Sequence, residues 1–263
     1  MQTFNPTAKN PWIVANLSSL EEALAAQQQG ADAIEFRCDL AIEDKNDPIK
    51  IIKEIRKATA LPILGTIRRS GDGGSWFYAF EGDESKRIQL FRNIIPYIDA
   101  IDVEIDSDIK EEVTGFARDK GLKVISSYHN FLITEKKEDI LKNIKQAQSA
   151  GGDIIKLAYM SSGNEDVLFL FKVLKEYLNK NSTPMTLIGM GPVGTATRLI
   201  FPCFGSCMTY GYIEGARHGA SGQMPIKVLR KYLNDMQPKV LSSSPDEEIL
   251  ESILNYEFSG VSS

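Results

Sequence analysis

Residues 12–37 read WIVANLSSLEEALAAQQQGADAIEFR, and they contain the first predicted strand, helix and second strand of the chain. The stretch opens on a short apolar run, Trp12 to Ala15, which predicts a strand. Apolar residues at helical spacing follow, with Ser18 as the expected N-cap and Gly30 as the stop. A second apolar run, Ala33 to Arg37, predicts the next strand. This order is typical of a parallel sheet with crossover helices.

The same unit recurs along the chain. Asp47 and Pro48 supply an N-cap and a first-turn proline for the next helix. Further helices are predicted at 87–95, 138–150, 165–178 and 226–235. The remaining strands are predicted at 63–67, 100–104, 123–127, 153–157, 185–189 and 208–210. Eight strands with helices between them predict an α/β fold, a parallel eight-stranded (β/α)₈ TIM barrel.

The length of 263 residues lies within the usual range of one such barrel. We therefore expect a single catalytic domain over residues 1–236. Residues 237–263 begin with a segment rich in Ser and Pro, and a short acidic helix is predicted at 246–256. We interpret this part as a C-terminal tail and not as a separate domain.

The composition excludes several classes of partner. A net charge of −5 and a pI near 5.3 give no basic patch for nucleic acid. The first residues lack a signal peptide, and no apolar run approaches the roughly 20 residues that span a bilayer. We expect a cytoplasmic protein without a membrane partner.

Three cysteines in a chain of this kind indicate reduced thiols. Cys203, Cys207 and His218 are conceivable zinc ligands, but their spacing matches no standard zinc pattern, and Cys38 lies far from them in sequence. We expect neither a metal nor another cofactor.

Charged residues recur on the predicted strands and directly after them. Helices cover the outside of a parallel barrel, so a charge inside is costly unless it serves a site at the C-terminal rim. The residues concerned are Glu35, Arg37, Arg68, Asp102, Glu104, His129 and Lys156. A structural ion pair between Glu35 and Arg37 is the simpler reading of those two residues.

Lys156 stands in the apolar run Ile154 to Ala158. It either extends to a rim or stays desolvated, and only a desolvated amine is a good nucleophile toward a ketone. His129 follows a strand, where an imidazole suits proton transfer, whereas His218 lies in a probable loop. Arg198 and Gln223, after the last two strands, are candidates to hold a carboxylate.

One motif points elsewhere. Residues 189–194 read GMGPVG, which matches the dinucleotide-binding pattern, and Glu214 follows about 20 residues later. That pattern normally opens a nucleotide-binding half, whereas here it stands in the seventh of eight units. We therefore do not expect a dinucleotide-binding site at this motif.

From about Ile13 to Lys227, the chain resembles the type I 3-dehydroquinate dehydratases. The family's E-x-R-x-D corresponds to residues 35–39, and its arginine followed by an acid and two glycines to Arg68, Asp72, Gly73 and Gly74. The other matching segments are 102–104, 127–131, 155–158, Met190 with Arg198, and Gly222 with Gln223.

The resemblance implies that 3-dehydroquinate loses water by syn elimination to give 3-dehydroshikimate, in the shikimate pathway of aromatic amino acid and chorismate biosynthesis. Lys156 would form a Schiff base with the C3 ketone, His129 would act as general acid and base, and Asp72 would orient His129. The implied substrate-binding residues are Glu35, Arg37, Arg68, Arg198, Gln223, Ser221 and Met190. The family also suggests a homodimer.

Two residues depart from the family pattern. Asp72 stands where the family often has Glu, and Ser221 is displaced within the terminal loop. These departures keep open a catalytically idle barrel that binds a cyclic acid. Another Schiff-base enzyme, such as a class I aldolase, would share Lys156. An aldolase that acts on phosphorylated sugars would also need a phosphate site, which the glycines at 189, 191 and 194 could form.

Overall fold

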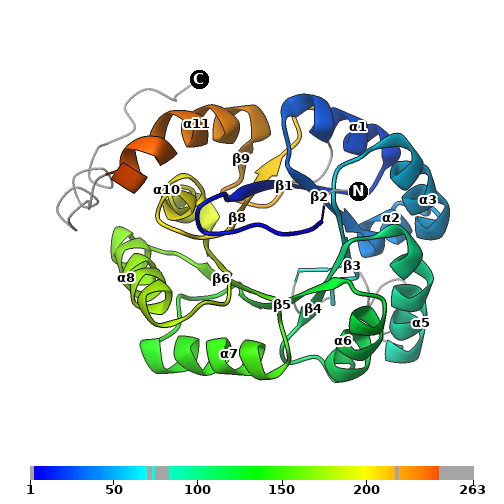
Figure 1. Ribbon diagram of the computed structural model, residues 1–263, viewed down its shortest axis with the longest axis horizontal. Helices are drawn as coiled ribbons and strands as arrows, with labels where there is room; N and C mark the ends of the chain where they lie inside the picture. The colour runs from blue at the N-terminus through cyan, green and yellow to red at the C-terminus, as the bar shows by residue number, and fades with distance from the viewer. Residues whose placement is uncertain (1–2, 70–72, 75–82, 217–218, 243–263) are drawn as a thin grey trace.

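The computed structural model describes residues 3–69, 73–74, 83–216 and 219–242. A parallel sheet curls into the inner wall of a (β/α)₈ barrel, as predicted (Figure 1). Its strands are β1 (Trp12–Leu17), β2 (Ala33–Arg37), β3 (Ile63–Thr66), β4 (Ala100–Glu104), β5 (Lys123–Asn130), β6 (Ile154–Met160), β7 (Met185–Met190) and β8 (Met208–Tyr212), and a two-residue strand, β9 (Met224–Pro225), pairs with β8.

The strands follow the order β7-β6-β5-β4-β3-β2-β1-β8-β9. Strands β1 to β6 therefore each pair with the next strand in the sequence, and β8 pairs with β1. The ring closes between β7 and the residues before β8. There the N–H of Cys207 donates to the carbonyl of Met185 at 2.9 Å, and the N–H of Leu187 donates to Ser206 Oγ at 3.2 Å. The eight strands therefore present one enclosed interior.

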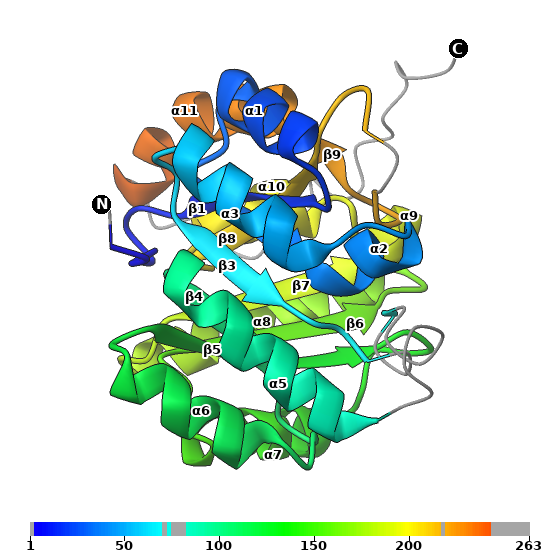
Figure 2. The same cartoon turned by 90° about the vertical axis from the view of Figure 1, so that its right-hand side faces the viewer.

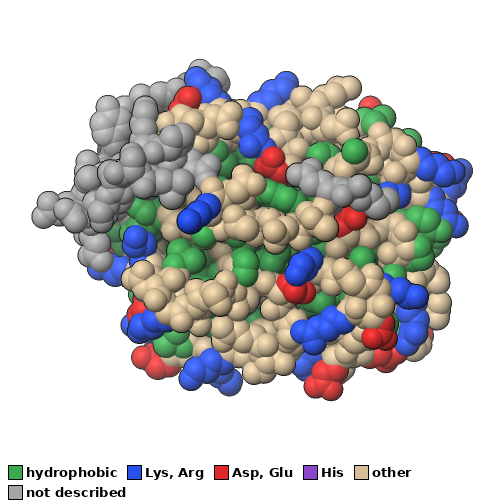
Figure 3. Space-filling view, in the orientation of Figure 1, with side chains coloured by type: hydrophobic (Ala, Val, Ile, Leu, Met, Phe, Trp, Pro, Cys, Tyr) green, Lys and Arg blue, Asp and Glu red, His purple; other side chains and the backbone are tan. Residues whose placement is uncertain are grey.

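Helices surround this wall (Figure 1). They are α1 (Leu20–Gln29), α2 (Cys38–Glu43), α3 (Pro48–Ala58), α5 (Glu84–Ile94), the 3₁₀ turn η2 (Ile95–Tyr97), α6 (Lys110–Asp119), α7 (Lys137–Ser149), α8 (Asn164–Lys180), α9 (Gly191–Gly194), α10 (Thr197–Cys203) and α11 (Ile226–Ser242). Within the described chain, no helix is long and apolar enough to cross a membrane. On the face drawn in Figure 3, positive and negative side chains are scattered and form no single basic patch.

The helix caps follow the sequence closely. Asp47 accepts from the N–H groups of Ile49 and Lys50 at 2.8 and 3.3 Å, as its place before Pro48 predicts. Gly30 ends α1 in the left-handed conformation. The predicted N-cap Ser18 is wrong by one residue.

Ser19 caps α1 instead of Ser18. The N–H of Glu22 donates to Ser19 Oγ, while the Glu22 carboxylate accepts from the N–H groups of both serines. A capping box needs an acid three residues after the cap, and Glu22 stands at that spacing from Ser19.

The end of the barrel viewed in Figure 1 is closed. Residues before β1 pass over it, and Phe4 packs edge-on against Trp12 with ring centroids 5.3 Å apart. Apolar side chains fill the interior beyond them: Val14, Ala33, Leu64, Ala100, Ile125 and Ile154. The loops that follow the strands gather at the opposite end (Figure 2), so a ligand enters from that end.

Helix α11 runs seven residues past the predicted end at Asp235, so it crosses the predicted domain boundary after residue 236. Buried Leu229 and Leu233 anchor it on the barrel, and a helix once started extends at little cost. The division into barrel and tail stays a prediction, and the acidic helix at 246–256 lies outside the described residues.

The glycines of residues 189–194 serve close packing between β7 and α9. A Cβ on Gly194 would lie 2.3 Å from the carbonyl carbon of Gly189, and Thr197 Oγ1 accepts from the N–H of Gly189 at 3.0 Å. Glu214 pairs with Lys227 at 3.1 Å. The barrel thus excludes a nucleotide-binding half at this motif.

Candidate active site

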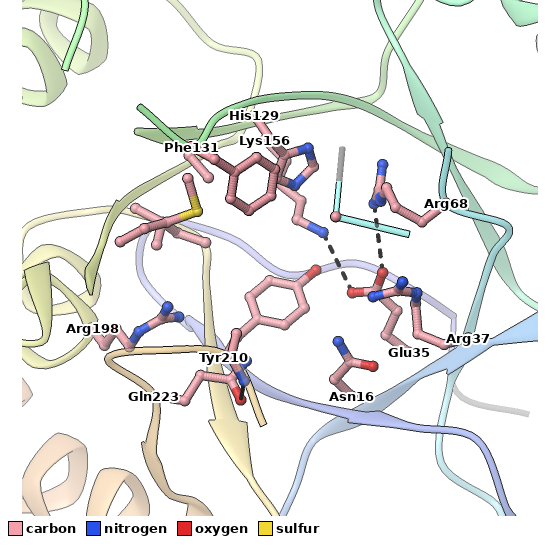
Figure 4. Close-up of a pocket in the computed structure, with 15 residues that line it drawn as sticks. Asn16, Glu35, Arg37, Arg68, His129, Phe131, Lys156, Arg198, Tyr210 and Gln223 are labelled. Carbon is pink, nitrogen blue, oxygen red and sulfur yellow. Dashed lines mark hydrogen bonds and ion pairs between the residues drawn. The ribbon is translucent and has the colours of Figure 1, made fainter. Parts of the chain in front are cut away.

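A pocket of about 140 Å³ opens at the C-terminal end of the strands. Eight of the ten predicted site residues line it (Figure 4): Glu35, Arg37, Arg68, His129, Lys156, Met190, Arg198 and Gln223. Strands of different units therefore bring together residues that lie up to 188 positions apart (35 to 223). Ser221 is exposed and is not part of the lining, and Asp72 lies outside the described residues.

Lys156 sits inside the barrel rather than at its rim. It is only 5% exposed, and its Nζ lies 3.0 Å from Asp102 Oδ2 and 3.4 Å from Glu35 Oε2. Strand β6 places Lys156 beside Ser127 of β5 and Thr186 of β7. The alternative in which this lysine extends to solvent is therefore wrong.

Arg68 ties the carboxylates of three strands together. Its Nη2 lies 2.7 Å from Asp102 Oδ1 and 3.7 Å from Glu35 Oε1, and its Nη1 lies 3.1 Å from Glu104 Oε1. Burial opposes the ionisation of Asp102, but the charges on Arg68 and Lys156 outweigh burial and hold the pKa of Asp102 below its ordinary value. Asp102 is therefore a fixed negative charge beside the amine.

Arg37 does not form the simple pair with Glu35 that the sequence suggested. Its guanidinium binds Asp39 through two hydrogen bonds, of 2.8 and 2.5 Å. Glu35 lies instead with Lys156 and Arg68. The ion-pair interpretation of Glu35 and Arg37 is therefore wrong, and both side chains border the pocket.

His129 follows Ser127 on the inward face of β5, next to Ala158 of β6. Its ring stacks on Phe131, with centroids 6.0 Å apart and planes inclined by 13°. Burial lowers the pKa of His129 well below its ordinary value, and the charges on Arg68 and Lys156 lower it further. The imidazole is therefore neutral near pH 7 and able to accept a proton.

Arg198 reaches the pocket from α10. It is 4% exposed, and among the described residues its Nε has no hydrogen-bond partner. Burial lowers the pKa of Arg198 to about 10, so the guanidinium is still charged near pH 7. An unpaired buried cation of this kind favours an anionic ligand.

A count of buried charges leads to the same conclusion. In the described part of the chain, four acidic side chains are buried: Glu35, Asp39, Asp102 and Glu104. Five basic ones are buried: Arg37, Arg68, Arg87, Lys156 and Arg198. The first four bases have acidic partners within 4 Å, so the excess positive charge belongs to Arg198. One ligand carboxylate would balance it.

Two of the polar side chains that line the pocket were not predicted. Tyr210 of β8 and Asn16 of β1 both line the pocket. The predicted first strand ended at Ala15, so Asn16 was not assigned to a face of the sheet. In the structure β1 continues to Leu17, and Asn16 lies on the same face as the buried Val14. Tyr210 lies in a predicted strand but carries no charge, and in a buried strand it is a charge that marks a candidate site residue.

The cysteines take no part in the pocket. Cys38, Cys203 and Cys207 are buried and unbridged, and burial raises the pKa of Cys207 to about 12. Among the residues that the structure describes, no group of three or more His, Cys, Asp or Glu side chains is arranged to hold a metal ion. His218 lies outside those residues.

Comparison with known proteins assigns the chain to a family. The model of the type I 3-dehydroquinase family matches residues 13–239. The chain belongs to the type I 3-dehydroquinase family. As a member, it is an enzyme of the 3-dehydroquinate dehydratase class, which places it in the shikimate pathway.

Individual relatives agree. The 3-dehydroquinate dehydratase of Methanosarcina acetivorans is 36% identical over 220 residues, which cover 81% of this chain and 89% of the relative. The crystal structure of the Geobacillus kaustophilus 3-dehydroquinate dehydratase has a TM-score of 0.79 at 30% identity, and covers 87% of this chain and 91% of its own.

A third relative adds a chemical detail. The type I 3-dehydroquinate dehydratase of Clostridium difficile was solved with covalently modified comenic acid. It has a TM-score of 0.76 at 29% identity, and the match covers 87% of this chain and 93% of that chain. Membership in this family favours the dehydratase over the aldolase alternative.

Proposed function

We propose that the pocket converts 3-dehydroquinate to 3-dehydroshikimate by syn elimination through a Schiff base on Lys156, with His129 as general acid and base. The observation that carries the proposal is the buried Lys156 amine, held 3.0 Å from Asp102 and 3.4 Å from Glu35. Imine formation with the C3 ketone supplies an electron sink that acidifies the C2 protons. The covalent comenic acid of the Clostridium difficile relative is consistent with a nucleophile in such a pocket.

The charges around Lys156 support an iminium over a neutral imine. Glu35 and Asp102 accept from Nζ, and the remaining buried acids are paired with arginines. An ammonium and a ketone give an iminium and water, so the position carries one positive charge both before the reaction and once the iminium has formed. The carboxylate partners of the free amine thus stabilise the intermediate without rearrangement.

His129 would remove a C2 proton and deliver it to the departing C1 hydroxyl. His129 lies on the same face of β5 as Ser127, which neighbours Lys156, so it stands one step nearer the open end of the barrel. Its lowered pKa keeps it neutral and ready to accept a proton near pH 7. One group serving as both base and acid fits elimination from a single face.

The remaining pocket residues would hold the substrate. Figure 4 shows Arg198 and Gln223 on one side of the pocket, where they would bind the carboxylate. Glu35, Arg37 and Arg68 would contact the ring hydroxyls, with Met190 as an apolar wall. An orienting role for Asp72, substrate contact by Ser221, a homodimer and a cytoplasmic location stay predictions.

Reductive trapping tests the proposal. Incubation with 3-dehydroquinate and sodium borohydride should add the mass of the reduced ligand to the protein, and peptide mapping should place it on Lys156. Borohydride without ligand is the control for direct modification. Turnover to the enone without any trapped adduct would contradict the Schiff base and leave the dehydratase activity in place.

The pH dependence of kcat/KM tests the role of His129. Because the base must be neutral and its pKa is lowered, activity should persist below pH 6.5 and fall only at more acidic pH. The measurement is a pH profile alongside imidazole NMR, with the His129 signal identified by its loss in His129→Gln. An acid limb above pH 6.5, or one that does not follow the imidazole titration, would contradict this role.

A further inference from the structure

Tyr210 is a pocket residue that the elimination mechanism leaves unused. It lies on β8 and is only 4% exposed. Lys156 Nζ stands 4.5 Å from the centroid of its ring, which is cation–π distance. Figure 4 shows the phenolic hydroxyl directed across the pocket toward the Lys156 amine and Glu35.

The hydroxyl needs an explanation of its own. It is buried and forms no hydrogen bond of ordinary geometry with a described residue, and its interaction with the Glu35 carboxylate contributes to its raised pKa. A phenylalanine would give the same ring contact with Lys156 without burying a polar atom, and an unsatisfied buried hydroxyl lowers stability. Such an atom aimed into a pocket indicates a partner that arrives with the ligand.

The hydroxyl is available as a donor. Burial raises the pKa of Tyr210 well above its ordinary value, and the negative charges of Glu35 and Asp102 raise it further. The phenol is therefore protonated near pH 7. It presents one O–H donor toward the atoms that become attached to Lys156.

We propose that Tyr210 is a further catalytic residue, whose hydroxyl donates a hydrogen bond to the C3 oxygen of the substrate while Lys156 adds to that carbon. The proposal rests on the Schiff base proposed above. Once the neutral His129 has taken a proton from the Lys156 ammonium, the amine forms the C3–N bond, and the electrons of the C=O bond move onto the oxygen. A proton passes from nitrogen to oxygen to give the carbinolamine. His129 then returns its proton to the carbinolamine hydroxyl, and loss of water leaves the iminium.

The charges of the neighbouring groups favour Tyr210 for this task. Glu35 and Asp102, which flank the amine, are carboxylates and would repel a developing oxyanion. Arg68 is held by Asp102, Glu104 and Ser127. The Tyr210 phenol is neutral, so it can donate a hydrogen bond to the C3 oxygen without changing the charge around Lys156.

The test is Tyr210→Phe, which keeps the ring over Lys156 and removes only the hydroxyl. Rapid mixing with 3-dehydroquinate, followed by quenching in borohydride, measures the rate of imine formation. We expect this rate to fall by about 10²-fold, as for loss of one oxyanion donor. Hydrogen exchange at C2 in the imine that has formed should keep its rate, because His129 is untouched.

Tyr212→Phe is the matched control, since Tyr212 lies on the same strand and is outside the pocket lining. Its imine should form at the wild-type rate. An unchanged rate in Tyr210→Phe, with the adduct still on Lys156, would overturn the role of Tyr210 and leave the Schiff base standing. An absence of adduct in the wild-type protein would overturn both proposals.

Discussion

Replacing Lys156 with methionine should lower kcat/KM by about 10⁵-fold or more, the loss typical of a removed catalytic nucleophile. Methionine matches the length of the lysine stem but offers no amine, so the C3 ketone stays a ketone and the C2 protons stay weakly acidic. Binding of 3-dehydroquinate should persist, because Arg198 and Gln223 are untouched. Steady-state kinetics with detection of the enone product, together with calorimetric binding, provides the measurement.

The variant needs a check on folding, because it removes a cation beside Asp102. Arg68 still pairs with that carboxylate at 2.7 Å, so we expect the barrel to fold and circular dichroism to stay unchanged. Lys123→Met is the matched control: Lys123 begins β5, is exposed, and pairs with Asp153 at the surface. Activity of Lys156→Met within tenfold of the control would eliminate covalent catalysis by this lysine.

The barrel could be predicted because its determinants are local. Asp47 and Pro48 define a helix start, Gly30 defines a helix end, and apolar runs between them define the strands. Elements that depend on tertiary contacts escaped prediction. Helix α2 begins directly after β2 at Cys38, and β9 is two residues long, so neither contains enough residues for a periodic pattern.

The site was predictable to the extent that it is charged. Glu35 and Lys156 stood out because a buried strand rarely carries an ionised group, and the structure brings them within 3.4 Å. Tyr210 and Asn16 bear no charge and fit an ordinary strand, so only the closed barrel shows that they face the pocket. Asn16 Oδ1 and the Tyr210 hydroxyl are buried without a hydrogen-bond partner of ordinary geometry, which can be recognised only once the neighbouring strands are in place.

Arg87 was missed for a different reason. On α5 it shares a face with Phe91 and Ile94, a spacing of four and seven residues that marks the buried side of a helix. A single arginine on such a face is usually read as a surface residue whose stem packs and whose head reaches water. In the structure Arg87 is fully buried and holds Glu104, one of the carboxylates that position Arg68.

The largest loss of stability should follow replacement of this Arg87 by methionine. Its Nε donates to the carbonyl of Ile67 at 2.8 Å, and its Nη2 pairs with Glu104. Removing one partner of a buried ion pair leaves an uncompensated charge and costs about 3–5 kcal/mol. Urea unfolding at pH 7 measures this change. Arg92→Met on the same helix, which breaks an exposed pair with Glu112, should cost less than about 1 kcal/mol.

The pH dependence separates the charge from the packing. Burial opposes the ionisation of Glu104, and the charges of Arg87 and Arg68 outweigh burial, so the pKa of Glu104 is lowered. In the wild type this contribution to stability is present above the unfolded pKa of a glutamate and is lost as the pH falls through the lower folded value. In Arg87→Met the folded pKa rises and Glu104 takes up a proton at milder acidity, so the difference in unfolding free energy should shrink from pH 7 toward pH 4. A difference that stays constant over this range would mean that Arg87 stabilises the barrel by packing alone.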